Sequence, residues 1–382
     1  MKDSKFSTCS AKPVENPIGL YIHIPFCIKK CPYCDFYSLT GDQALYHRYK
    51  EAVVRAIGST PYKSLAVDSI YFGGGTPSLL GAEHLLDILH TAKQQFSVAD
   101  NCEVTLEANP SSTDLPLLRA LVKGGFNRVS FGLQSTKADT LATLGRLHSY
   151  QEGAKAVALA KEAGFPHISA DIMLGVPGQT AADCADAAAE IAALPVDHIS
   201  AYLLKLEPGT PFYTRYTEQD DDLLCDCYEA FAGRLTDLGY SQYEISNFSK
   251  DGCESRHNTK YWTLAPYLGI GPSAHSFMEG KRFYFPRDLE GFLNAHNPWE
   301  AVVQDGAGGD FAEAVMLGLR LSRGINLSEL REQYQLDIAP LLAAAKPLVK
   351  AGLLILSEDR IALTPQGMLL SNSIITKLLG SY

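Results

Sequence analysis

The first 240 residues repeat one pattern, in which a short apolar segment is followed by a turn and then by a helix-like segment. The apolar segments are the expected strands, at residues 20–24, 69–72, 102–107, 127–131, 168–173 and 198–205. Strands that alternate with helices are typical of parallel α/β folds. We therefore predict an α/β protein with an incomplete (βα)6 barrel, and a doubly wound sheet is the structural alternative.

Residues that can bind metals or other ligands follow these expected strands directly. In parallel α/β folds the loops at the carboxyl ends of the strands carry the ligand sites. The residues at such positions are Cys27, Cys31, Cys34, the glycines 73–75, Glu107, Gln134 and Asp171. We expect them to share one cleft.

The three cysteines have the spacing C-x3-C-x2-C in one loop. Thiolates on one loop can ligate three irons of a [4Fe–4S] cluster, which leaves the fourth iron open. A zinc knuckle is an alternative, but zinc prefers four ligands and no second pair follows at zinc-finger distance. Three thiols without a ligand are the remaining alternative.

The glycine segment 73–75, with Thr76 and Pro77 after it, permits a close approach of backbone to a ligand, because glycine has no Cβ. A tight turn without a ligand explains the same residues equally well. Similarly, Glu107 and Asp171 are either ligand contacts or solvated acids at strand ends.

Composition restricts the partners of the protein. The formal net charge of −10 argues against a general nucleic-acid-binding surface. Nine cysteines with a reactive triplet indicate a reducing compartment. The chain has neither a membrane-length apolar run nor the apolar core of a signal peptide near its start, so we expect a cytoplasmic protein and leave peripheral membrane contact open.

The cysteine spacing, preceded by Tyr-x-His-x-Pro-Phe, resembles the radical S-adenosylmethionine (SAM) superfamily. This resemblance implies that Cys27, Cys31 and Cys34 hold a [4Fe–4S] cluster whose open iron binds SAM. It also implies a set of SAM contacts. These are Tyr21, Gly74, Gly75, Thr76, Glu107, Gln134, Arg146 and Asp171.

Further motifs narrow the resemblance to the branch of oxygen-independent coproporphyrinogen III oxidases. They are Phe-Gly-Gly-Gly-Thr-Pro, Phe-Gly-Leu-Gln-Ser, Gly-Arg-x-His and Asp-x-Met-x-Gly-x-Pro-Gly-Gln. The oxidases of this branch carry a fourth cysteine, where this chain has Phe36, and a longer N-terminal extension. HemW-type haem chaperones have Cys-Asp-Phe at this place, as this chain does at residues 34–36.

The haem chaperones of this branch also share the motif His-Asn-x-x-Tyr-Trp, which is present at residues 257–262. An imidazole is a common axial ligand of haem iron, and aromatic rings can stack on a porphyrin. The resemblance thus implies haem contacts by His257, Tyr261 and Trp262, with His257 as a hypothetical axial ligand and His275 as a second candidate. Without the resemblance, a histidine beside two aromatic residues is more simply a packed residue.

We expect three parts of the chain: a lead-in at 1–17, a radical SAM barrel with the haem-motif extension at 18–300, and a small domain at 301–382. In the last part, helices precede a short hairpin near residues 353–363, which resembles a winged-helix module. Because a dense basic cluster is missing, we expect this module to contact protein or cover the cleft rather than bind DNA.

The function expected from this resemblance is that of a haem chaperone, which binds haem and passes it to acceptor haemoproteins. An oxygen-independent coproporphyrinogen III oxidase or another radical SAM enzyme of porphyrin metabolism is the alternative, and a structural or sensing cluster is a third. We assign no catalytic residue. Whether the acceptors are membrane-associated respiratory proteins, and whether the protein forms a homodimer, stay open.

Overall fold

A computed structural model describes residues 17–217 and 219–380 of the chain. The lead-in predicted at residues 1–17 therefore lies, except for Pro17, outside the described residues. No helix in the described ranges is both long and apolar enough to cross a bilayer.

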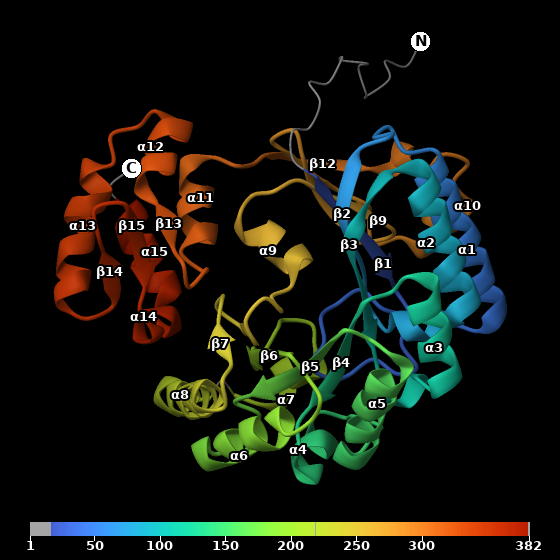
Figure 1. Cartoon of the computed structure of the whole chain (residues 1–382), viewed down its shortest axis with the longest axis horizontal. Helices are drawn as coiled ribbons and strands as arrows, with labels where there is room; N and C mark the ends of the chain where they lie inside the picture. Colours follow the sequence, from blue (N-terminus) through green and yellow to red (C-terminus); the bar gives the residue numbers. More distant parts are fainter. Residues whose placement is uncertain (1–16, 218, 381–382) are drawn as a thin grey trace.

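Six parallel strands form the wall of the barrel, and they neighbour one another in the order of the sequence. The strands are β1 (Ile18–Ile24), β2 (Ala66–Gly74), β3 (Ser97–Ala108), β4 (Arg128–Gln134), β5 (His167–Leu174) and β6 (His198–Leu203). Figure 1 shows them as an arc with the connecting helices on its outer side. A doubly wound sheet would reverse its strand order part-way, so the sequential order excludes that alternative and confirms the predicted barrel.

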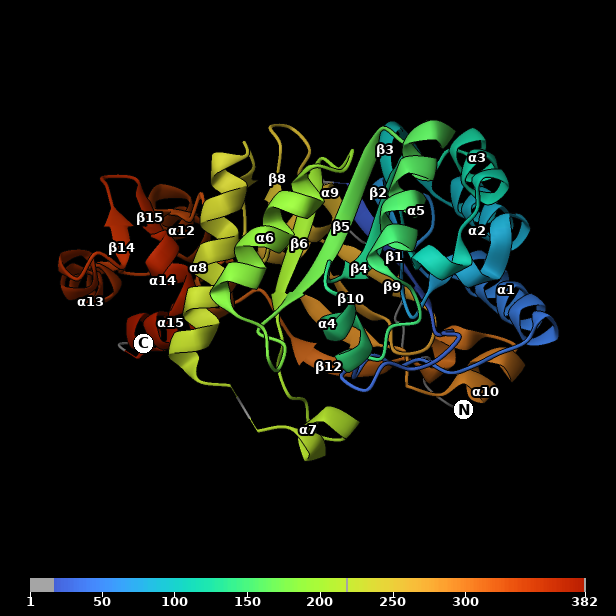
Figure 2. The ribbon, with the colours of Figure 1, turned by 90° about the horizontal axis from the view of Figure 1, so that it is seen from below.

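The helices that follow these strands cover the outside of the arc. They are α1 (Gln43–Gly58), α2 (Gly81–Gln95), α3 (Leu115–Gly124), α5 (Tyr150–Ala163), α6 (Ala181–Ala192) and α8 (Asp221–Asp237). The short helices α4 (Ala138–Thr143) and α7 (Pro211–Arg215) lie instead toward the carboxyl ends of the strands (Figure 2). Capping defines where several begin: the side chain of Asp42 accepts from Leu45 N, and Ser149 forms a capping box with Glu152. The chain turns at Gly145, with φ +67°, and this turn separates α4 from α5.

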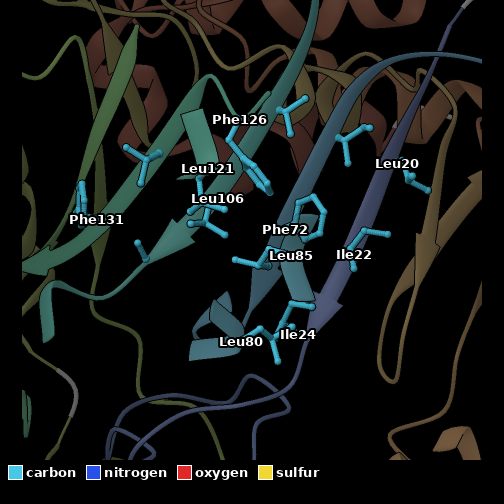
Figure 3. Close-up of a cluster of buried hydrophobic side chains, with 14 of the residues drawn as sticks. Leu20, Ile22, Ile24, Phe72, Leu80, Leu85, Leu106, Leu121, Phe126 and Phe131 are labelled. Atoms are coloured by element: carbon cyan, nitrogen blue, oxygen red, sulfur yellow. The ribbon is translucent and has the colours of Figure 1, made fainter. Parts of the chain in front are cut away.

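The main core lies between the barrel wall and the outer helices. Leu20, Ile22 and Ile24 of β1 point outward into it, beside Phe72 of β2 and Leu106 of β3 (Figure 3). The alternate residues of the same strands face the barrel interior, because strand side chains alternate between two faces. Aliphatic residues therefore pack the outside, and the interior receives polar and aromatic residues such as Tyr71 and Glu107.

Further strands extend the sheet beyond the six parallel ones. They are β7 (Ser241–Gln242), β8 (Asn247–Ser249), β9 (Tyr267–Ile270), β10 (His275–Met278), β11 (Lys281–Tyr284) and β12 (Val303–Ala307), with helices α9 (Arg256–Trp262) and α10 (Leu289–Asn294). Strand β9 pairs with β1 in parallel, and β8 pairs with β6 antiparallel. Because β7 and β12 end the described sheet without pairing to each other, the barrel is open along one side.

The C-terminal part has its own core, which includes Phe311, Val315, Leu341 and Ile361. Its elements are α11 (Phe311–Gly318), β13 (Ile325–Asn326), α12 (Leu327–Tyr334), α13 (Ala339–Lys350), β14 (Leu354–Leu356), β15 (Arg360–Leu363), α14 (Pro365–Leu369) and α15 (Ser371–Leu379). The hairpin predicted after three helices is present as β14 and β15, and β13 joins it. The winged-helix assignment and the domain boundaries stay predictions.

Candidate functional site

A cleft with a volume of about 650 Å³ opens at the carboxyl ends of the barrel strands. Ten of the predicted site residues line it together. They are Cys27, Cys31, Cys34, Gly74, Gly75, Thr76, Glu107, Gln134, Arg146 and Asp171. The expectation that strand-end residues share one cleft is thus confirmed, whereas Tyr21 is not among its lining residues.

The cysteine loop is anchored on both sides. At its start, Cys27 N donates to Leu39 O at 2.9 Å. In its middle, Pro32 O accepts from Phe212 N at 3.0 Å, and the rings of Tyr33 and Phe212 lie 6.0 Å apart. Helix α7 thereby supports the loop from outside the barrel, so that all three free thiols face the cleft.

Two hydrogen-bond donors contact the cysteine sulfurs. Thr76 Oγ1 lies 3.6 Å from Cys27 Sγ, and Arg146 Nη1 lies 3.6 Å from Cys31 Sγ. Burial raises the pKa of the Cys34 thiol. Donors and positive charge near a sulfur favour its thiolate form, which is the form that binds metals.

The glycine segment permits a close approach between the ends of β1 and β2. A Cβ at Gly75 would lie 2.5 Å from Phe26 O, and one at Gly74 would lie 2.6 Å from the ring of His23. The N–H groups of the segment are used within the protein: Gly74 donates to Glu107, Gly75 to Ile24 O, and Thr76 to Phe26 O. Toward a ligand, the segment therefore presents hydrogen-bond acceptors rather than backbone N–H donors.

Two carboxyl groups lie inside the barrel below the cysteines. Glu107 accepts from Tyr71 Oη at 2.8 Å and from Gly74 N at 3.0 Å, and burial raises its pKa to about 7. Asp171 accepts from Ser130 Oγ at 2.9 Å, and burial raises its pKa as well. These contacts rule out the alternative that both are ordinary solvated acids.

Gln134 and Arg146 carry polar atoms without a partner in the described part of the protein. Gln134 Oε1 and Arg146 Nε are both buried and accept or donate no hydrogen bond there. Gln134 also has φ +67°, a conformation that costs energy for a residue other than glycine. Strain and unpaired buried polar atoms in one cleft are typical of a ligand site.

The cleft and the interior below it contain residues that our sequence analysis missed, among them Tyr71, Ser130 and Tyr202. Each stands at an even spacing from a predicted site residue on its own strand or on the neighbouring strand. Tyr71 is two residues before Gly73, for example, and Ser130 pairs with Glu107 in register. The period of two along each strand is the signal that could have found them.

The haem-motif residues lie at the opposite end of the barrel, which we call the barrel floor and define by α9 and the strand starts that it contacts. Figure 2 shows α9 toward one end of the strands and α4 and α7 toward the other. Lys260 of α9 pairs with Asp68 near the start of β2 at 2.9 Å, and its Nζ donates to Pro17 O before β1. Helix α9 is thus a closing element of the barrel.

His257 is fully buried in the barrel floor. Its Nδ1 bonds with Ser69 Oγ at 3.0 Å and its Nε2 with Tyr261 Oη at 2.9 Å. The ring of Tyr261 packs edge-on against Tyr267, and Arg320 lies over the ring of Trp262. In this arrangement both ring nitrogens of His257 are hydrogen-bonded within the protein, and the haem contacts of His257, Tyr261 and Trp262 stay predictions.

Tyr21 lies in the barrel interior. Its Oη bonds with His23 Nδ1 at 2.9 Å, and its ring lies 6.2 Å from that of Tyr71 and 6.5 Å from that of His257, which stack on each other at 5.1 Å. Tyr21 thus lies near both the interior residue Tyr71 and the floor residue His257, and its contact with SAM stays a prediction.

Comparison with known proteins agrees with this geometry. The profile of the Radical SAM superfamily matches residues 21–191, and that of the HemN C-terminal domain matches residues 311–370. Haem chaperone HemW of Mycobacterium tuberculosis is 35% identical over 95% of both chains. The chain belongs to the HemW family. HemW of Haemophilus influenzae is 38% identical over 74% of this chain and 78% of its own.

Coproporphyrinogen III oxidase HemN from Escherichia coli, described as a radical SAM enzyme, has the same fold. The TM-score is 0.82 at 22% identity, over 96% of this chain and 91% of the oxidase. Membership of the HemW family confirms the predicted relationship, the radical SAM fold and, at the level of the superfamily, the [4Fe–4S] cluster and SAM as cofactors.

Proposed function

We propose that this protein is a haem chaperone that binds haem and transfers it to acceptor haemoproteins. The main support is the cleft, in which the three-cysteine loop and the polar residues at the strand ends meet. In addition, the chain matches haem chaperones over nearly its full length. Phe36, which stands where the oxidases carry a fourth cysteine, is 68% exposed at this cleft.

The cleft residues fit a cluster and SAM. Three free thiols on one loop match three irons, and the unpaired Gln134 Oε1 and Arg146 Nε need a polar partner. Cys27, Cys31 and Cys34 would hold the cluster, which supplies a one-electron reductant and an open iron when bound. The guanidinium of Arg146 suits the SAM carboxylate.

The remaining contacts follow from the hydrogen-bond chemistry of the cleft. The SAM amino group is a donor, so it suits the Gly74–Thr76 segment, whose own N–H groups are already engaged. Asp171 and Glu107 can accept hydrogen bonds from ribose hydroxyls or from the amino group. Gln134 can pair its unsatisfied oxygen with a ligand donor.

Haem would bind at the mouth of the cleft rather than at the barrel floor. Ile28, Phe36 and Leu147 are exposed apolar residues that line this mouth, and burial against a porphyrin would remove their surface from water. Lys29 lines it too and can pair with a haem propionate.

His275 is the more suitable axial-ligand candidate. It begins β10, which runs antiparallel to β9, and β9 runs parallel to β1. His275 therefore lies at the same end of the sheet as the cysteine loop. Its side chain is exposed, with the ring stacked 5.0 Å from that of Tyr284.

The test is an anaerobic reconstitution with iron and sulfide, followed by haem titration and a coproporphyrinogen III assay on the same sample. We expect stoichiometric haem binding, transfer of haem to an apo-haemoprotein, and no decarboxylation. Decarboxylation without stable haem binding would instead identify an oxidase.

The place of haem binding is tested by substitution. Phe36→Asp combined with Leu147→Asp should weaken haem binding at least about tenfold, because charge at an apolar contact costs desolvation energy. Leu336→Asp, at an exposed apolar residue of the C-terminal part, is the matched control and should have no effect. If His257→Ala lost haem while the Phe36→Asp and Leu147→Asp double variant kept it, this would show that α9 opens to bind haem. It would refute haem binding at the mouth of the cleft.

A further inference from the structure

A second group of ligand-type side chains lies at the amino-terminal ends of the strands, away from the cysteine cleft. His167 is the first residue of β5, Asp197 directly precedes β6, and Cys253 lies in the turn between β8 and α9. Their ligand atoms all lie within 4.8 Å of one another. None of the three lines the cleft that holds the cluster cysteines, so the group needs its own explanation.

Hydrogen bonds to the backbone hold Asp197 and Cys253 in place. Asp197 N donates to Ile168 O at 3.0 Å, and Asp197 Oδ1 accepts from Ile168 N at 3.1 Å, which orients the carboxylate. Asp197 O accepts from Lys250 N at 2.9 Å, and Lys250 O in turn accepts from Cys253 N at 3.0 Å. The positions of the carboxylate and the thiol are therefore set by the same short network.

The donor set has the composition of a transition-metal site. It combines one imidazole nitrogen, one carboxylate oxygen and one thiol sulfur, which zinc accepts together in tetrahedral coordination. Magnesium and calcium prefer oxygen ligands alone and do not suit it. A site with three protein ligands leaves the fourth position to water.

The distance between the imidazole and carboxylate ligand atoms is close to the one that zinc requires. His167 Nδ1 lies 2.8 Å from Asp197 Oδ2, as a hydrogen-bonded pair. Zinc bonds of about 2.0–2.1 Å at a tetrahedral angle separate two such atoms by about 3.3 Å. An opening of about half an ångström would replace the shared proton by a metal ion.

The group is accessible from outside. All three residues are partly exposed. His167 also lines a groove with Pro166, Gly252 and Glu254, which the side chains of Arg128, Arg256, Lys260 and Arg323 border as well.

We propose that His167 Nδ1, Asp197 Oδ2 and Cys253 Sγ form a zinc site with water as fourth ligand. The ion connects the starts of β5 and β6 to the turn that leads into α9, and so fastens the barrel floor. This site is independent of the proposed haem function, because it shares no residue with the cleft.

The test uses the full chain with Cys27, Cys31 and Cys34 replaced by serine, so that the cluster thiols bind no added metal. Cobalt(II), a spectroscopic probe of zinc sites, is titrated anaerobically. We expect one equivalent to bind with a thiolate-to-cobalt charge-transfer band, and zinc to displace it. In the same background, Cys253→Ala should remove the band and weaken cobalt binding at least about tenfold.

Cys225→Ala is the matched control, since Cys225 is a partly exposed cysteine on α8 outside this group, and it should leave the band unchanged. Circular dichroism checks the fold of each variant, and His167→Gln provides a second ligand substitution if Cys253→Ala does not fold. A charge-transfer band that persists in Cys253→Ala or His167→Gln, or the lack of any such band in the cysteine-to-serine parent, would overturn the proposal.

Discussion

The two ends of the barrel both bury polar groups, but the predicted ligand residues at the two ends differ in how completely their polar atoms are paired. At the cleft, Gln134 Oε1 and Arg146 Nε have no partner among the described residues. At the floor, both ring nitrogens of His257 are bonded, and Glu103 accepts from Arg128 Nε, Arg256 N and His257 N. Unpaired polar atoms that line a cleft suit a ligand bound there, whereas the fully bonded ring of His257 suits a structural role.

This difference changes the interpretation of the His-Asn-x-x-Tyr-Trp motif. Glu103 lies at the amino end of α9, where its carboxylate satisfies helix N–H groups and complements the helix dipole. His257, which is fully buried, bonds Ser69 of β2 and Tyr261 of α9. The bond to Ser69 holds the helix against the sheet. The motif can accordingly be explained by packing of the barrel floor.

The largest effect is expected from a substitution that removes a cluster ligand in the cleft and leaves the barrel floor unchanged. Cys31→Ser should abolish the visible absorption of the reconstituted cluster, because the cluster loses one of three protein ligands. Iron and sulfide analysis measures the loss, and Cys225→Ser is the control. Because the side chain faces the cleft and not the core, the thermal midpoint of the cluster-free protein should stay unchanged.

The converse change breaks the floor. His257→Ala should lower the free energy of unfolding by about 2–4 kcal/mol, through a cavity and the lost bonds to Ser69 and Tyr261. Chemical denaturation measures it, with the exposed His275→Ala as control. Stability equal to the wild type would mean that His257 is not a structural residue.

Acid should weaken the floor. Burial lowers the pKa of both His257 and His198 to about 3, so the folded protein keeps them neutral between pH 6.5 and 3 while the unfolded chain binds protons. Stability therefore falls as pH drops below 6.5, with a limiting slope of about 1.4 kcal/mol per pH unit for each histidine. Denaturation from pH 7 to 5.5 measures this slope, and a flat profile would contradict it.

A smaller effect of opposite sign is expected in the cleft. Burial raises the pKa of Glu107 to about 7, so the folded state holds a proton that the unfolded chain releases above its lower pKa, and stability is lost as pH rises toward 7. Glu107→Gln should stabilise the SAM-free protein by about 1–2 kcal/mol at pH 8 and steepen the acid dependence of the floor. The same variant should bind SAM less tightly in equilibrium dialysis; unchanged SAM binding would remove Glu107 from the site.

Much of the cleft could be predicted from the sequence because its residues stand at the carboxyl ends of strands. Cys27, Glu107, Gln134 and Asp171 are far apart in the chain, yet the parallel topology brings them to one edge. The hydrophobic periodicity of the strands and the turn residues after them were sufficient to predict this edge. Residues such as Tyr71 and Tyr202 were missed because the aliphatic outer face dominates each strand, and the alternate residues attract less notice.

The floor could not be predicted in this way. The burial of His257 depends on where α9 docks, and α9 follows the sixth strand by a long connection without βα periodicity. A Cβ at Gly19 would lie 3.0 Å from the His257 ring, so this position needs a glycine. The sequence alone does not indicate that His257 is the neighbour that requires it. The sequence pattern therefore does not reveal contacts between elements that are not consecutive in the chain, such as the proximity of His167, Asp197 and Cys253.

The pairing of β1 with β9 has a consequence for synthesis on the ribosome. Gly19 lies opposite Tyr267, so the first strand has one neighbour missing until about 250 further residues have been translated. At about 5–20 residues per second, this edge stays uncovered for roughly 10–50 s. The cysteine loop follows directly after β1, and its support by Phe212 is also translated late. Iron can therefore be delivered to a finished loop only after most of the barrel has left the ribosome.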